Sequence, residues 1–130
     1  MAVASDHLTA SHLAYLRTQR LGRLATVDAT GAPQNNPVGF RVRDDGRIDI
    51  PGSANDQTRK WRNIARNPHV AFVVDDFQAD PWQVRFVEVR GIAEQIPDPD
   101  PQPGKPSGAL IRITPQQVFA YGLDDEHPPH

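Results

Sequence analysis

Residues 69–96, HVAFVVDDFQADPWQVRFVEVRGIAEQI, hold the clearest fold signal in the chain. They open with HVAFVVDD, a continuous apolar run that is typical of a buried strand. From Val84 the sequence alternates with period two, which places Val84 and Phe86 on one side of a strand and Val87 on the other. We interpret residues 75–82, between the two runs, as a hydrophilic loop that ends in a tryptophan. The stretch therefore predicts two strands of a sheet.

Two helices and several shorter strands are predicted on either side of this stretch. LTASHLAYLRTQRLG predicts an amphipathic helix with Thr9 as its N-cap and Gly22 at its end. QTRKWRNIARNP predicts a second helix, which Pro68 stops. Residues 114–117, TPQQ, have the composition of a helix start. The remaining strands are predicted over residues 24–27, 33–43, 47–50, 109–113 and 118–122.

These elements predict the fold class. Six or seven short strands with two flanking helices favour a mainly β chain and a small β-barrel over a parallel sheet. A chain of 130 residues is expected to form a single domain, residues 1–130. Residues 96–108 are a proline-rich loop without a folding signal of their own, and the tail, residues 123–130, is expected to be mobile.

Composition excludes several classes of site. The formal net charge is −2, so no global positive field attracts nucleic acid and any anion site must be local. The absence of cysteine excludes disulfides and thiolate chemistry, and the five histidines show no metal-ligand spacing, so no metal is predicted. The N-terminus lacks the pattern of a signal peptide, and no apolar run reaches the roughly 18 residues of a membrane span. We therefore expect a soluble, cytoplasmic protein with no membrane or nucleic-acid partner.

Residues 55–63, NDQTRKWRN, place a cluster of cations at the start of the second helix, and Lys60 is one of only two lysines in the chain. The first turn of a helix exposes unpaired N–H groups, which suit an anion. A threonine hydroxyl at Thr58, a guanidinium at Arg59 and an ammonium at Lys60 would complete a phosphate cradle. One alternative is a solvated basic face. A more remote one is a basic helix over residues 58–67 that binds nucleic acid or an acidic partner.

Residues 35–40, NNPVGF, are unusual for a strand. Two asparagines, a proline and a glycine pack poorly there, but they suit a place where the backbone approaches a flat ligand. An edge strand with a bulge explains them equally well. Trp82 also has two interpretations: it contacts a ligand or a second subunit, or it covers the edge of the core, which is our first expectation.

Taken in order, these motifs resemble the FMN-binding split-barrel superfamily, the pyridoxamine 5′-phosphate oxidase-like proteins. The matching segments within residues 21–95 are LATVDATGAPQNNPVGF, DGRIDI, TRKWRNIARNP, VAFVVDD and VEVRGIAEQI. IRITPQQVFAYGLD resembles the closing strands. TRKWRNI, VEVRGIAE and this ending are similar to the actinobacterial branch that depends on the deazaflavin coenzyme F-420. The resemblance implies a six- or seven-stranded antiparallel split barrel, paired as a homodimer with the cofactor at the subunit interface.

The resemblance also assigns residues to a cofactor site. In the oxidases a Ser-Arg-Lys at the helix start grips the flavin phosphate, and Thr58, Arg59 and Lys60 match it here. Asn36 falls where the oxidases carry a phosphate-binding arginine, and Arg41 falls where they carry a lysine near the cofactor. The other members of the implied site are Pro37, Val38, Ser53 and Asn63, together with Trp82 and Arg85 from the region that closes over the cofactor ring of the second subunit.

The implied activity is that of an F-420-dependent oxidoreductase, chiefly a reductase. Reduced deazaflavin would pass a hydride from its C5 to an electron-poor C=C or C=N bond of a small organic molecule, while the protein supplies grip, orientation and electrostatics. The alternative is FMN, in an oxidoreductase or a flavin-binding protein of the same fold. No catalytic residue is identified. Tyr121 is a candidate proton donor, with solvent as the alternative.

Overall fold

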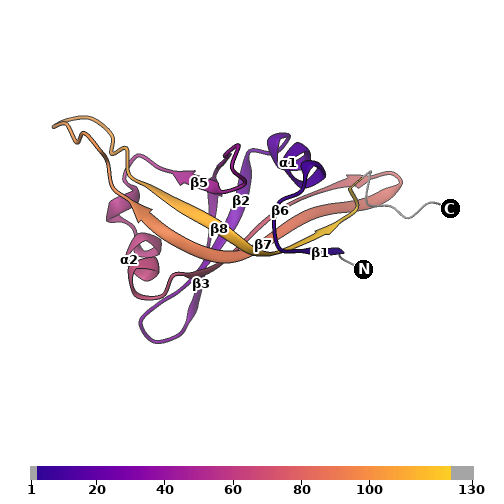
Figure 1. The fold of residues 1–130 in the computed structure, drawn as a ribbon, viewed down its shortest axis with the longest axis horizontal. Helices are drawn as coiled ribbons and strands as arrows, with labels where there is room; N and C mark the ends of the chain where they lie inside the picture. The colour runs from indigo at the N-terminus through magenta and orange to yellow at the C-terminus, as the bar shows by residue number, and fades with distance from the viewer. Residues whose placement is uncertain (1–2, 124–130) are drawn as a thin grey trace.

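The computed structural model describes residues 3–123, in which eight strands, two α-helices and a short 3-10 helix follow one another. The strands are β1 (Val3–Ser5), β2 (Leu21–Val27), β3 (Pro33–Gly39), β4 (Arg41–Val42), β5 (Ile48–Pro51), β6 (His69–Ala79), β7 (Trp82–Ile96) and β8 (Leu110–Tyr121) (Figure 1). The helices are α1 (Ala10–Arg17) and α2 (Arg59–Arg66), with the 3-10 helix η1 (Asn55–Gln57) just before α2.

All eight strands belong to one antiparallel sheet in the order β3-β2-β6-β7-β8-β5-β4, with β1 added along β8. The two edge strands of this path, β3 and β4, are separated in the chain only by Phe40. The sheet must therefore curl until its edges approach each other, which gives a barrel that is split along one seam. The predicted fold class is confirmed. The strand count differs because β1 was not predicted, the strand predicted over residues 33–43 breaks at Phe40, and the last two predicted strands are one.

That single last strand, β8, contains a β-bulge, and the helix start predicted in its middle is wrong. Arg90 of β7 pairs with Gln117, whereas Gly91 pairs with Pro115, so β8 carries one extra residue. Proline cannot donate to a ladder, and a bulge is one of the few places where a strand accommodates it. A Cβ atom on Gly91 would collide with the carbonyl of Thr114, so the close approach of the two strands requires glycine here.

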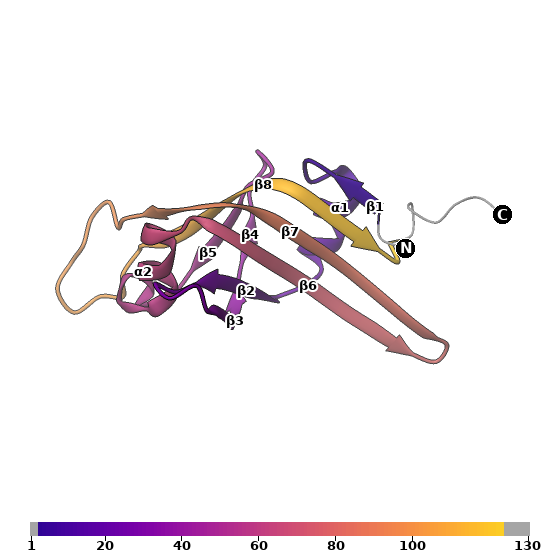
Figure 2. The same ribbon diagram turned by 90° about the horizontal axis from the view of Figure 1, so that it is seen from below.

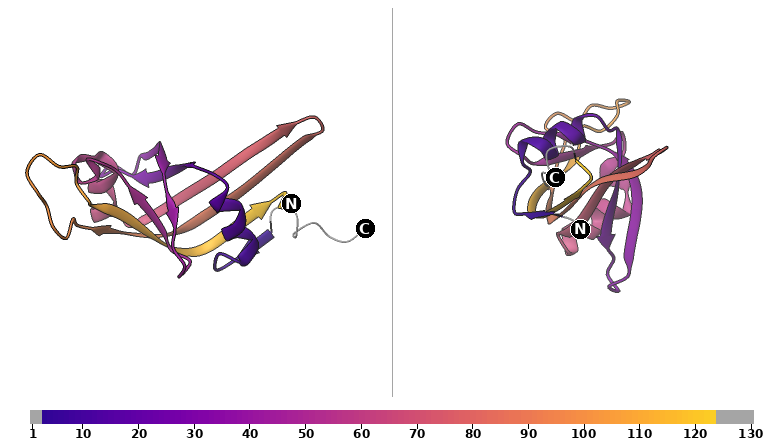
Figure 3. Two further views of the ribbon diagram at one scale, coloured as in Figure 1. Left: turned by 90° about the horizontal axis from the view of Figure 1, so that it is seen from above. Right: turned by 90° about the vertical axis from the view of Figure 1, so that its right-hand side faces the viewer.

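Strands β6 and β7 form a long hairpin that runs beyond the barrel (Figures 2 and 3). Past the pair Phe86–Tyr121, where β8 ends, residues 76–85 pair only within the hairpin, and we call them the arm. The loop predicted over residues 75–82 is wrong, because pairing continues to a two-residue turn. Polar and apolar side chains mostly alternate in this segment, as expected for a strand with two different faces, but its many polar residues gave it the look of a loop.

Helix α1 begins as predicted but ends early. The Thr9 hydroxyl accepts a hydrogen bond from the His12 N–H, and the last helical residue is Arg17. Gly22 does not end the helix: it lies in β2, where a Cβ atom would strike the ring of Phe72. A glycine signal of the kind found at helix ends thus reflects close packing inside the barrel.

The core fills the barrel and is closed by buried side chains from both helices, Tyr15 and Leu16 from α1 and Ile64 from α2. Its fully buried strand residues are Leu24, Ile48, Ile50, Phe72, Val74, Val87, Val89, Ile111, Ile113, Val118 and Ala120. Leu123 is also buried, which corrects the first residue of the predicted mobile tail; residues 124–130 lie outside the described part. Within residues 3–123, no helix is long and apolar enough to cross a membrane.

Replacing Gly91 by alanine should lower the free energy of unfolding by about 1–3 kcal/mol, because the added methyl group must displace backbone at the bulge. The measurement is urea denaturation at neutral pH. The matched control is Gly39→Ala in β3, where a Cβ atom meets nothing closer than the Arg20 carbonyl at 4.0 Å. We expect the control to stay within about 0.5 kcal/mol of wild type. Equal effects at the two glycines would contradict the role assigned to the bulge.

Candidate functional site

A pocket of about 580 Å³ lies between the edge strand β3 and the start of α2. Its lining residues are Gln34, Asn35, Asn36, Thr58, Arg59 and Lys60. The fold therefore brings together two segments that the sequence singled out separately, the asparagine-rich strand and the cationic helix start. Four of the predicted cofactor residues meet here. We call this site the α2 pocket.

Thr58 holds the start of α2 in place. Its hydroxyl accepts a hydrogen bond from the Trp61 N–H at 3.3 Å and donates its proton to the Asn55 carbonyl at 2.7 Å. Because a hydroxyl has one proton, Thr58 acts in this state as a helix cap rather than as a donor to the pocket. The backbone N–H groups of Arg59 and Lys60 belong to the first turn and have no intrahelical acceptor. They add donors and partial positive charge to the pocket.

The side chains of Arg59 and Lys60 bring positive charge to the pocket, where the carboxylate of Asp28 interacts electrostatically with Arg59. No ion pair of either is recorded among residues 3–123. Burial lowers the pKa of Lys60 from its ordinary value of 10.5, because the ammonium group loses water without gaining a carboxylate. An anion in the α2 pocket would supply the missing counter-charge. The site is thus suited to a phosphate and is poorly suited to a cation.

Asn63, which the resemblance implies at the site, lies behind the α2 pocket and does not line it. Its side chain is buried, and Nδ2 donates to Thr26 Oγ1 at 3.0 Å and to Gln34 Oε1 at 2.8 Å. Helical spacing sets Asn63 one turn after Arg59 and Lys60, on the same side of α2. The side of the helix that carries the cations is therefore also the side tied to β2 and β3.

Four other residues implied at the site do not line this pocket. Pro37 is exposed on β3, whereas the side chain of Val38 is buried in the core, so only its backbone is left to face a ligand. Arg41 is exposed on β4. The Ser53 carbonyl accepts a hydrogen bond from the Ser107 N–H at 2.9 Å, which ties down the end of the proline-rich loop.

Trp82, Arg85 and Tyr121 lie on or beside the arm, at the opposite end of the molecule from α2 (Figure 1). Trp82 is 69% exposed at the tip and its ring lies 5.1 Å from that of Phe77, so the expectation that it covers the core is wrong. Tyr121 stacks on Phe86 with ring centroids 5.9 Å apart. Within one chain, none of the three reaches the α2 pocket.

The chain matches the pyridoxamine 5′-phosphate oxidase family over residues 8–122. The chain belongs to this family. It is 41% identical over 122 residues to 5a,11a-dehydrotetracycline/5a,11a-dehydrooxytetracycline reductase of Streptomyces rimosus, and the alignment covers 91% of this chain and 85% of the relative.

Solved structures share the fold of this family member. A conserved hypothetical protein from Mycobacterium tuberculosis superimposes with a TM-score of 0.71 at 21% identity, over 97% of this chain and 92% of the other. An FAD-binding protein from Mesorhizobium loti gives a TM-score of 0.68 at 20% identity, over 92% and 96% of the two chains. At these identities the two likenesses establish the split-barrel architecture.

Sequence reasoning missed Gln34 and Asn35 as lining residues. A signal for Gln34 was present: alternation along a strand sets it on the same side as Asn36, which the resemblance had marked. Asn35 stood in the asparagine pair but was not assigned to the site. Neither residue carries a charge. Residue type alone therefore does not mark either amide as part of a site until the position of the facing helix α2 is known.

Arg85 is committed to a cluster at the base of the arm. Its guanidinium donates to both oxygens of Asp76, at 3.0 and 2.6 Å, and lies 5.0 Å from the centroid of the Tyr15 ring. The Tyr15 hydroxyl donates to Asp76 at 2.9 Å. Burial, then the Asp76 hydrogen bond, raises the pKa of Tyr15 well above its ordinary value of 10, and the Arg85 hydrogen bond lowers the pKa of Asp76. The cluster fastens α1 to the arm.

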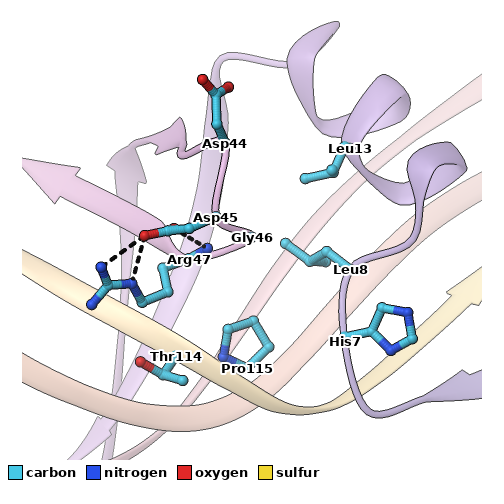
Figure 4. A pocket seen from close by; sticks show the side chains of 9 residues that line it. All are labelled: His7, Leu8, Leu13, Asp44, Asp45, Gly46, Arg47, Thr114 and Pro115. Atoms are coloured by element: carbon cyan, nitrogen blue, oxygen red, sulfur yellow. Dashed lines mark hydrogen bonds and ion pairs between the residues drawn. The ribbon is translucent and has the colours of Figure 1, made fainter.

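A second pocket, of about 280 Å³, lies between α1 and the β4–β5 turn (Figure 4). It is lined by His7, Leu8, Leu13, Asp44, Asp45, Gly46, Arg47, Thr114 and Pro115. Asp45 accepts hydrogen bonds from Arg47, and Asp44 lies 3.6 Å from Arg17. Both carboxylates are thus paired within the protein. Among residues 3–123, no group of three or more histidine and acidic side chains is placed to hold a metal ion.

Tyr15→Phe should lower the free energy of unfolding by about 1–2 kcal/mol at pH 7, because Asp76 loses a donor. The pKa of Tyr15 is higher in the folded than in the unfolded chain, so above pH 10 the unfolded chain releases this proton first and wild type loses stability. The difference between the two proteins should therefore shrink as the pH rises above 10. Urea denaturation across this range tests it, and a constant difference would rule the cluster out as the cause.

Proposed function

We propose that the protein is a cytoplasmic reductase that uses the deazaflavin coenzyme F-420 and acts on an electron-poor double bond of a small organic molecule. The observation that carries the proposal is the α2 pocket, where Arg59 and Lys60 lie at a helix start without a recorded ion pair within residues 3–123, in a chain 41% identical to a reductase. F-420 and FMN both carry a phosphate, and the donor set of the pocket fits that group.

Arg59 and Lys60 would hold the phosphate of the cofactor by charge-assisted hydrogen bonds, together with the first N–H groups of α2. Thr58 would act indirectly, by capping the helix so that these groups point into the pocket. The backbone from Asn36 to Val38 would border the ring. When bound, the reduced coenzyme supplies a hydride from C5, and the protein contributes binding and orientation.

The relative suggests which double bond is reduced. Its name describes a substrate with unsaturation between ring carbons 5a and 11a, and a reductase activity. Of the two bonds that an F-420-dependent reductase of this kind would attack, C=C or C=N, we therefore propose a C=C bond. FMN remains the alternative cofactor, since the family likeness and an FAD-binding protein of the same fold are compatible with any flavin-type ring.

We further propose that the protein works as a homodimer. The outer face of the sheet carries exposed or half-buried apolar residues, among them Val73, Phe86 and Phe119, and this apolar surface continues along the arm to Phe77. A second copy would cover this face and bring the arm of one protomer toward the α2 pocket of the other. Trp82, Arg85 and the candidate proton donor Tyr121 would then belong to a site completed by the partner.

Lys60→Ala should weaken binding of F-420 by about 1–3 kcal/mol, the loss expected for a charge-assisted contact, and leave the fold intact. Fluorescence quenching of purified protein titrated with F-420, and in parallel with FMN, gives the dissociation constants. The control is Arg62→Ala on the same helix: Arg62 donates to the Gln57 carbonyl at 3.2 Å and does not line the pocket. Unchanged affinity in Lys60→Ala would overturn the phosphate site. Tight FMN binding without F-420 binding would select the alternative cofactor.

Light scattering of the wild-type protein should give about twice the chain mass of 14.4 kDa. Val73→Asp would place a carboxylate on the outer face opposite Glu88, and we expect it to give monomers with weakened cofactor binding. Lys105→Glu, in the proline-rich loop, changes charge away from this face and should stay dimeric. A monomeric wild type that binds the cofactor would refute the shared site.

A further inference from the structure

A hydrogen-bonded chain of three side chains runs behind the α2 pocket. Thr26 and Gln34 are direct cross-strand partners of β2 and β3, and Asn63 of α2 packs over the pair. Asn63 Nδ2 lies 3.0 Å from Thr26 Oγ1 and 2.8 Å from Gln34 Oε1. Thr26 is 1% exposed and Asn63 is 6% exposed, whereas Gln34 is partly exposed and lines the pocket. The chain therefore leads from the protein interior to the ligand surface.

The arrangement fixes which end of the Gln34 amide is available. A side-chain amide has one acceptor oxygen and one NH₂ group with two donor hydrogens. Asn63 uses both of its hydrogens, one on Thr26 and one on Gln34, so the Gln34 oxygen is engaged on the side of the helix. For Gln34 Nε2 no hydrogen bond is recorded within residues 3–123, and this group remains to serve the pocket.

A donor at this position agrees with the α2 side of the pocket. Arg59 and Lys60 only donate, and so do the first backbone N–H groups of α2. A ligand that satisfies all of them must present several acceptor oxygens on one side, as a phosphate does. Had Gln34 turned its oxygen toward the pocket, it would repel such a group.

We infer that Gln34 is a further ligand-binding residue, whose Nε2 donates to a phosphate oxygen held by Arg59 and Lys60. Asn63 is a positioning residue that acts only through Gln34, by holding the amide in the donating orientation before the ligand arrives. Without Asn63 the amide would be free to rotate, and binding would have to overcome the lost rotational freedom. The inference rests on the phosphate-bearing cofactor of the proposed function.

A double-mutant cycle on dissociation constants tests the inference, with F-420 and FMN as probes. We expect Gln34→Ala to weaken binding about five- to tenfold, as for one donor to a charged acceptor, and Asn63→Ala to weaken it about threefold or more. The double variant should bind within about twofold of Gln34→Ala, because Asn63 has nothing left to position. Gln102→Ala, an exposed glutamine of the proline-rich loop, should match wild type.

A purely structural part for Asn63 predicts a different pattern. Loosening of α2 would weaken binding whether or not Gln34 is present, so the two effects would multiply, and this result would overturn the inference. Thr26→Val gives a second measurement if Asn63→Ala folds poorly. This substitution removes only the Thr26 hydroxyl, the interior end of the hydrogen-bonded series, at nearly constant side-chain volume. Its effect on binding should also vanish in the Gln34→Ala background.

The outcomes separate this inference from the proposed function. If wild type binds FMN but not F-420, the proposed coenzyme is wrong and the cycle is measured with FMN. If wild type binds either probe but Gln34→Ala binds it within twofold of wild type, the inference fails while the proposed function stands. If wild type binds neither probe, both fail.

Discussion

The pairing of β7 on both of its sides is the constraint on which the rest of the structure depends. β7 is joined to β6 along one edge and to β8 along the other, and the bulge opposite Gly91 divides β8 into two parts. Before the bulge, residues 110–113 reach β5 and close the barrel; after it, residues 118–120 carry β1 and lead to the base of the arm. Across this one irregularity, β8 stays paired with β7 from the closed core to the base of the projecting hairpin. A glycine is needed at that point because the strands approach too closely for a side chain.

The distribution of charge explains how a chain with a net charge of −2 offers an anion site. In the described part of the chain, seven of the twelve arginines take part in recorded ion pairs, whereas none is recorded for any cation of α2. The buried carboxylate of Asp49 shows the contrast: burial alone would raise its pKa, but Arg112 and Arg43 hold the pKa below its ordinary value. Elsewhere most of the positive charge is paired with carboxylates, and only Arg20, Arg41 and Lys105 have no recorded ion pair within residues 3–123. At α2 the cations have no recorded ion pair within the described part of the chain and are available to a ligand. The local electrostatic potential there is therefore positive although the net charge of the chain is negative.

Local signals predicted the elements whose cause is local. The cap at Thr9, the helix that begins near Thr58 and the alternation of β7 depend on neighbours within a few residues, and all three predictions are confirmed in the structure. The failures arise where pairing with a distant strand overrides a local signal. Gly22 has the look of a helix end but serves the packing of Phe72, and the proline of TPQQ suits a helix start but sits in a bulge set by β7. No pattern inside a single segment carries that information.

The candidate site shows a second limit of the same kind, which concerns geometry rather than pairing. The resemblance implied one set of site residues, yet the fold brings only four of them to the α2 pocket and places Trp82 and Arg85 on the arm, at the opposite end of the molecule. A set of site residues inferred from a sequence does not show whether one protomer or two protomers contribute them. Gln34 makes the complementary point, because its type alone leaves open whether it donates or accepts. The answer depends on Asn63 and Thr26, two residues in other elements whose hydrogen bonds engage the oxygen and leave the nitrogen to the pocket. Whether a polar side chain donates to a ligand or accepts from it is therefore decided by the hydrogen bonds that the side chain makes within the protein, away from the ligand.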